Sequence, residues 1–154
     1  MSVSLLARTT LALCLAASLA ACGETGGGLA PGLVAGMDAP GATLDRGAAF
    51  ALLNQYRGTT GADALTDDPG LDAEALSLAQ QYAASGTAPK LPPDATGLRV
   101  SAGYANFADT FSGWRNNPSD AAVLADARAH RAGLASFYSA NSGYGVYWVL
   151  LVAN

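Results

Sequence analysis

The sequence has little charge and almost no histidine or cysteine, and each shortage excludes a class of function. Charged residues make up 13% of the 154 residues, against about 25% in an average soluble domain. Eight lysines and arginines stand against twelve acidic residues and form no cluster, which argues against nucleic-acid binding. One histidine and two cysteines leave little material for a metal site, a Cys–His nucleophile pair or a disulfide framework.

Residues 1–21 are typical of a signal peptide. Arg8 precedes an apolar run from Leu11 that is too short to span a bilayer as a stable helix, and small residues follow it. The Leu-Ala-Ala-Cys sequence that ends at Cys22 resembles the lipobox of bacterial lipoproteins. This resemblance implies lipidation of Cys22, which would anchor the protein to a membrane of the bacterial cell envelope. Because Gly23 and not aspartate follows, the implied membrane is the outer one. The alternative is ordinary cleavage that leaves Cys22 as a free thiol.

Residues 22–44 are predicted to form a flexible tether, since they contain seven glycines and two prolines and show no sustained periodicity. The folded domain is expected to span residues 45–154. Helical spacing of apolar residues predicts a helix over 45–57 with Gly58 as its stop, and a second from the N-cap Asp68 to Gly86.

The second half of the domain is predicted to contain a strand, two helices and a hairpin. The strand covers 98–102, and an aromatic stripe of Phe107, Phe111 and Trp114 marks a helix whose buried face it forms. A short helix is expected from Pro118 to Ala127, and two β-rich runs flank the turn at 141–143. The last run is almost wholly apolar, which favours a central strand covered on both faces. Together these elements predict an α+β layered domain.

Several segments, in this order, resemble the CAP superfamily (cysteine-rich secretory proteins, antigen 5 and pathogenesis-related proteins) in its bacterial SCP-like branch. The resemblance implies a three-layer α-β-α sandwich with a concave cleft and a C-terminal β-hairpin. It rests on Leu53-Asn54-Gln55-Tyr56-Arg57, Leu65-Thr66 with Pro69 and Leu71, Ser101-Ala102-Gly103-Tyr104, Phe111-Ser112-Gly113-Trp114-Arg115, Asn117-Pro118 and Tyr147-Trp148-Val149-Leu150.

The family's cleft holds two histidines and acidic residues that can ligate a divalent metal, and this chain differs at those positions. Leu98 replaces the glutamate, Asp120 replaces one histidine, and the other would fall near Lys90. The single histidine, His130, lies further along the chain between two arginines. A zinc site needs three or four convergent ligands, so we expect no metal and no cofactor.

Four residues are predicted to line the cleft or contact a ligand: Leu98, Tyr104, Arg115 and Asp120. Asp120 also has a structural interpretation, because an acid in the first turn complements the helix dipole. A solvated or capping role is expected for His130.

We expect a non-catalytic binding or scaffolding module of the envelope, without catalytic residues. Its partner would be a small apolar ligand, as the family resemblance suggests, or an envelope protein. The alternative is a metal-independent hydrolase of envelope polymers that uses Asp109 or Asp120, since such chemistry needs carboxylates across a cleft. A third interpretation is a structural spacer. No Gly-x-Ser-x-Gly nucleophile motif occurs.

Overall fold

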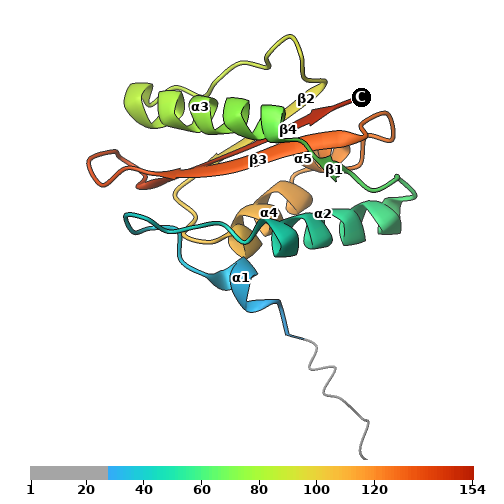
Figure 1. Ribbon diagram of the computed structural model, residues 1–154, viewed down its shortest axis with the longest axis horizontal. Coiled ribbons are helices and arrows are strands. Elements are labelled where there is room, and N and C mark those ends of the chain that lie inside the picture. Colours follow the sequence, from blue (N-terminus) through green and yellow to red (C-terminus); the bar gives the residue numbers. More distant parts are fainter. Residues whose placement is uncertain (1–27) are drawn as a thin grey trace, which may run out of the picture.

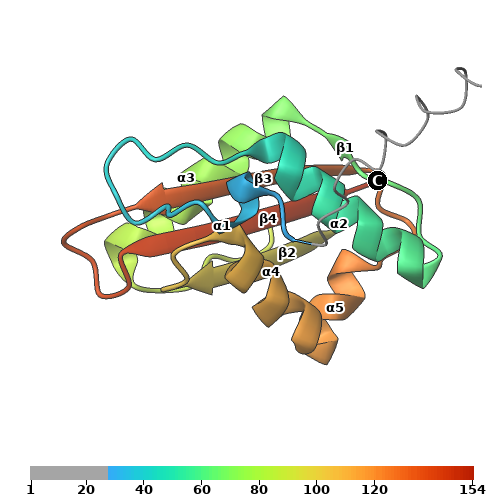
Figure 2. The same cartoon turned by 90° about the horizontal axis from the view of Figure 1, so that it is seen from below.

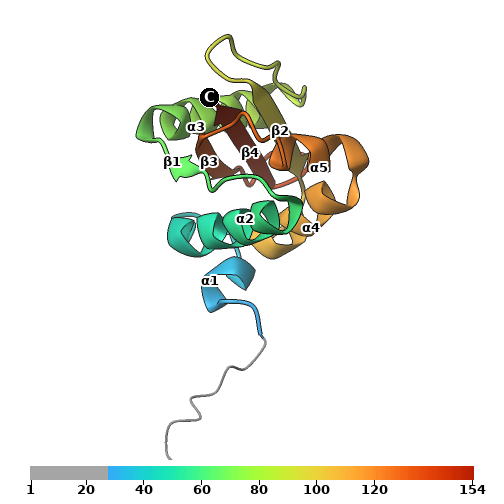
Figure 3. The same cartoon turned by 90° about the vertical axis from the view of Figure 1, so that its right-hand side faces the viewer.

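The computed structural model describes residues 28–154, and the signal peptide and Cys22 lie outside this range. A four-stranded sheet separates one long helix from a layer of shorter elements (Figures 1 and 3). This arrangement confirms the predicted α+β fold. In chain order the elements are α1 (Pro31–Val34), α2 (Arg46–Thr60), β1 (Thr66–Asp67), α3 (Pro69–Ser85), β2 (Gly97–Ala102), α4 (Phe107–Asn116), α5 (Pro118–Leu124), β3 (Arg131–Tyr138) and β4 (Val146–Ala153).

The last strand, β4, is the centre of the sheet. The strand order is β1-β3-β4-β2, with β3 and β2 antiparallel to β4 and β1 parallel to β3. All of β4 is buried, as its apolar sequence predicts. Successive side chains of a strand point to opposite faces, so β4 contributes Trp148 and Leu150 to one core and Val149 and Leu151 to the other. The β3–β4 pair is the predicted C-terminal hairpin.

The aromatic stripe of α4 forms the centre of the first core, which confirms its predicted burial. Phe107, Phe111 and Trp114 are each at most 3% exposed. The ring of Phe107 lies 5.8 Å from that of Trp148, centroid to centroid. Trp114 also fixes the edge of the sheet, because its indole N–H donates to the carbonyl of Val100 at 3.1 Å.

The second core lies between the sheet and α3, where small side chains let the backbones come close. Ala75 and Ala79 of α3 are fully buried. A side chain at Gly133 of β3 would overlap the backbone of Leu71, so this contact requires glycine. The start of α3 matches the prediction, since the Asp68 carboxylate accepts hydrogen bonds from the backbone N–H groups of residues 70 and 71.

The predicted tether is wrong from Pro31 onward. Leu33 and Met37 are each 5% exposed and belong to the first core. The backbone N–H of Met37 donates to the carbonyl of Ala105 at 2.7 Å. The segment combines one helical turn with irregular chain, so its buried residues follow no period that the sequence could reveal. The folded domain therefore begins before Asp45.

Two predicted helix ends are also wrong. Helix α2 passes Gly58 and ends at Gly61, whose φ of 77° gives the left-handed C-cap. Helix α5 ends at Leu124 rather than Ala127, because the Leu124 carbonyl accepts a hydrogen bond from a buried arginine.

That arginine, Arg57, joins α2 to the connection between α5 and β3. It is fully buried, and its guanidinium donates to four backbone carbonyls: Asp63 at 2.6 Å, Leu124 at 2.7 Å, Ala129 at 3.0 Å and Asp126 at 3.2 Å. Burial lowers the pKa of Arg57, and the charges of Asp126 and Asp63 partly offset that effect. The planar fork of guanidinium donors suits this spread of acceptors, and an ammonium does not.

Replacing Arg57 by lysine is therefore expected to destabilise the fold. A buried carbonyl left without a donor costs about 1–3 kcal/mol, so Arg57→Lys should lower the free energy of unfolding by at least about 2 kcal/mol in urea titrations. The matched control is Arg128→Lys, because the side chain of Arg128 is 80% exposed; this change should stay within about 0.5 kcal/mol. Equal effects of the two substitutions would contradict the role assigned to Arg57.

Candidate functional site

The residues predicted to line a cleft belong to β2, α4, α5 and the connection between β2 and α4. Figure 2 shows α4 and α5 beside the outer strand β2. Along β2 the side chains of Leu98 and Val100 pack on the α3 side of the sheet. Arg99, between them, points to the opposite face, where α5 lies against the strand. Alternation along β2 thus decides which predicted residues can meet.

Asp120 forms an ion pair with Arg99. The Arg99 guanidinium donates to the Asp120 carboxylate, and the two side chains are 23% and 24% exposed. Asp120 occupies the first turn of α5, whose N-cap is Asn117, so its predicted position at a helix N-terminus is confirmed. The Nε of Arg99 is buried and has no hydrogen-bond partner among the described residues.

The structure separates Leu98 from Asp120, because Leu98 leaves β2 on the other face and is half-buried against the α3 core. The prediction that Leu98, Tyr104 and Asp120 line one cleft is wrong in this respect. The strand register explains the error, since adjacent residues of a strand point to opposite faces. Arg99, which the sequence interpretation did not single out, is the β2 residue that reaches Asp120.

Arg115 lies on α4, and Tyr104, in the connection between β2 and α4, packs against that helix at Gly113. Tyr104 is 43% exposed, and its hydroxyl would lie 3.1 Å from a Cβ placed on Gly113. Arg115 is exposed, with its guanidinium carbon 5.9 Å from the centroid of the Phe111 ring. Both side chains are exposed, and in the described part of the chain neither forms a hydrogen bond or ion pair with Arg99 or Asp120.

The remaining candidates have structural roles. Asp109, one carboxylate of the alternative hydrolase, is exposed and accepts a hydrogen bond of 2.8 Å from the amide of Asn106, the N-cap of α4. His130 is exposed, and its backbone carbonyl accepts from Thr66 N–H. Asp109 thus bonds to Asn106, whereas Asp120 pairs with Arg99.

These residues do not fit a divalent metal. Within residues 28–154, no three His, Cys, Asp or Glu side chains lie close enough together to hold one. The Asp120 carboxylate is already paired with the guanidinium of Arg99, whose positive charge would repel a metal ion. Within the same range, no helix has the length and apolar composition needed to cross a membrane.

Sequence reasoning missed a second charged cluster, at the opposite edge of the sheet. The Arg46 guanidinium donates to Asp67, to Asp72 and, at 2.5 Å, to the backbone carbonyl of Leu134. Asp72 also accepts from the N–H of Leu134 at 3.0 Å. Burial raises the pKa of Asp72, although that hydrogen bond and the charge of Arg46 act in the opposite direction. The partners are far apart in sequence, so no local pattern could reveal the cluster.

Solved structures of known proteins share this fold. The protein MpPR-1i aligns with a TM-score of 0.58 at 17% identity, over 70% of this chain and 88% of its own. An outer surface protein of Borrelia burgdorferi aligns with a TM-score of 0.51 at 17% identity, over 71% and 92% of the two chains. An extracellular protein of Bacillus anthracis that contains an SCP domain has a TM-score of 0.56 at 13% identity, over 69% of this chain and 39% of its own.

A family model identifies the chain. The model of the cysteine-rich secretory protein family, CAP, matches residues 50–152. The chain therefore belongs to the CAP family, as its ordered motifs predict. None of the curated proteins matches it by sequence.

Proposed function

We propose that this protein is a lipid-anchored CAP domain of the bacterial cell envelope that binds or positions a partner and carries out no chemistry. The observation that supports this most directly is the Arg99–Asp120 ion pair. It engages the carboxylate that stands in place of a family histidine, and Leu98 stands in place of the family glutamate. A site built around Arg99 and Asp120, with Leu98 directed to the other face of β2, has neither the ligands for a metal nor a free base.

The proposed location rests on two observations. The sequence up to Cys22 resembles a lipobox, and proteins with the same fold include an outer surface protein of Borrelia burgdorferi and an extracellular protein of Bacillus anthracis. A lipid anchor at Cys22 followed by a folded domain from about Pro31 would hold the domain close to the membrane, with a shorter connection than the sequence suggests.

A zinc titration followed by calorimetry tests the absence of a metal site. The full chain should show no saturable, stoichiometric binding of zinc at micromolar protein concentrations, because its cleft lacks convergent ligands. Asp120→Asn should give the same heats as the unchanged protein. Stoichiometric binding that disappears in Asp120→Asn would contradict the proposal and would restore Asp120 as a ligand.

Replacing Cys22 by serine tests the anchor. A hydroxyl at this position cannot form the thioether to the lipid, so Cys22→Ser should abolish metabolic labelling with a fatty acid and release the protein from the membrane fraction. Cys14→Ser, within the signal peptide, is the matched control and should leave labelling intact. Persistent labelling of Cys22→Ser would refute the lipid anchor. It would not affect the proposal that the domain lacks a metal site, which the zinc titration tests separately.

A further inference from the structure

The outer edge of β3 is only partly covered. On its inner side β3 pairs with β4 from Arg131 to Tyr138. On its outer side β1 pairs only with Arg131 and Ala132. From Leu134 to Tyr138, no strand among the described residues lies against this edge.

The hydrogen-bond pattern shows which groups face outward. Ser139 N–H donates to the carbonyl of Gly145 at 2.7 Å, so the odd-numbered residues of β3 bond to β4. In an antiparallel pair the alternate residues direct both backbone groups away from the partner. At Leu134 the outward N–H donates to Asp72, and the outward carbonyl accepts from Arg46. Within residues 28–154, no protein group bonds to the outward N–H and carbonyl groups of Ser136 and Tyr138.

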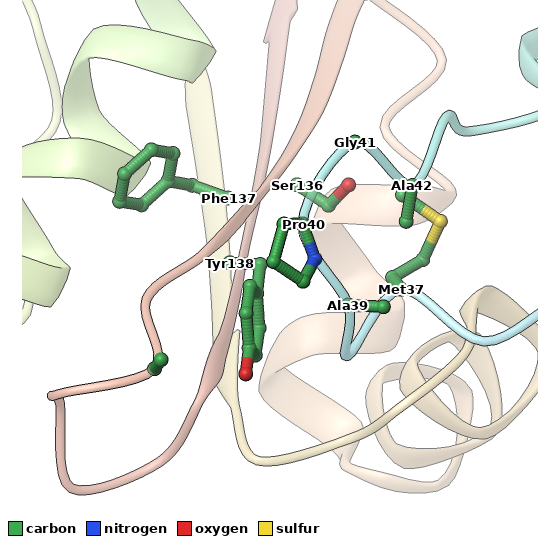
Figure 4. A pocket seen from close by; sticks show the side chains of 9 residues that line it. Met37, Ala39, Pro40, Gly41, Ala42, Ser136, Phe137 and Tyr138 are labelled. Atoms are coloured by element: carbon green, nitrogen blue, oxygen red, sulfur yellow. The ribbon is translucent and has the colours of Figure 1, made fainter.

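A slot lies beside these free groups. It is a cavity of about 390 Å³ between Ser136 and Tyr138 on one side and Met37 with residues 39–42 on the other (Figure 4). Its far wall is a tight turn, closed by a hydrogen bond of 3.2 Å from Ala42 N–H to the carbonyl of Ala39. Pro40 and Gly41, with φ of 78°, are the central residues of this turn, as a type II turn requires. The wall is therefore ordered before any ligand arrives.

The side chains that line the slot suit an uncharged peptide. Its lining contains no Asp, Glu, Lys, Arg or His side chain, so a charged residue would lose water there without gaining a partner. A second cavity of about 410 Å³ shares Ala42 and Ser136 with the slot, and it is lined by the charged side chains of Arg46 and Asp72. The uncharged surface is therefore confined to the slot itself, where the edge offers backbone groups at strand spacing.

We propose that this slot, named here the β3-edge slot, binds an extended, uncharged segment of a partner polypeptide as an added strand. Backbone hydrogen bonds to Ser136 and Tyr138 would hold the segment, in the manner of β-strand addition. In a second copy of this chain the same edge lies behind its own 37–42 turn, so two folded copies would have to displace both turns to pair. The β3-edge slot would provide the surface for the proposed binding role, and an extended peptide would be its partner. Binding at the slot requires neither the lipid anchor nor a metal.

The test uses the uncharged peptide acetyl-Thr-Val-Thr-Val-Thr-amide, whose residues favour strands. Added to the ¹⁵N-labelled full chain in detergent, it should shift the amide signals of Ser136 and Tyr138 saturably. It should also slow hydrogen exchange there by about tenfold or more. Phe137, whose backbone groups bond to β4, should change less. The same peptide with alternate amides N-methylated, so that one of its edges cannot donate, should bind more weakly.

Two variants locate the binding. Ser136→Pro removes an outward N–H without breaking the bonds to β4 and should weaken binding about tenfold, the loss of roughly one good hydrogen bond. Ser136→Ala keeps the backbone and should bind normally. If Ser136→Pro fails to fold, Ala42→Trp should block the slot from its other wall.

Two results would overturn the proposal. One is the absence of saturable shifts at millimolar peptide. The other is protection of Ser136 and Tyr138 that rises with protein concentration without peptide, together with a dimeric mass, which would make this edge a self-association surface. Either result leaves the zinc and lipid experiments unaffected, so failure of the slot and failure of the proposed function are distinguishable.

Discussion

A strand that is apolar on both faces must be covered on both faces, and β4 imposes this requirement on the whole domain. Helix α3 covers one face, with alanines and Gly133 allowing close approach. The other face needs α2, α4, α5 and the segment from Pro31 to Leu44. Arg57 then joins two parts of this second layer through backbone carbonyls. The layered fold follows from satisfying both faces of one strand.

Features with local causes could be predicted from the sequence. The cap at Asp68, the aromatic stripe of α4 and the terminal hairpin each depend on residues close together in the sequence, and the structure confirms them. The segment after Pro31 could not be predicted, since its burial depends on a layer assembled from other elements. The same holds for Arg46, which bonds to Leu134, 88 residues away.

The contacts in the candidate site also depend on residues far apart in the sequence, so they could be predicted only in part. Family membership is confirmed, while the substitution of family ligands by Asp120 and Leu98 stays a prediction of the resemblance. Which residues meet there depends on the alternation of β2, which directs Arg99 and not Leu98 toward Asp120.

Both edges of the sheet are partly capped by side chains, Trp114 on β2 and Arg46 with Asp72 on β3. At the end of β3, unlike at Leu134, the outward backbone groups of Ser136 and Tyr138 bond to no side chain among the described residues, and a cavity lies beside them.

We propose that the Arg99–Asp120 ion pair occupies the position of a family metal ligand. A double-mutant cycle with Arg99→Met and Asp120→Asn measures this pair directly, because the effect of Asp120 on the helix dipole cancels in the coupling term. For two side chains about a quarter exposed, the account predicts a stabilising coupling of about 0.5–1 kcal/mol in unfolding experiments. A coupling of zero would contradict it, since Asp120 would then be free to serve another function.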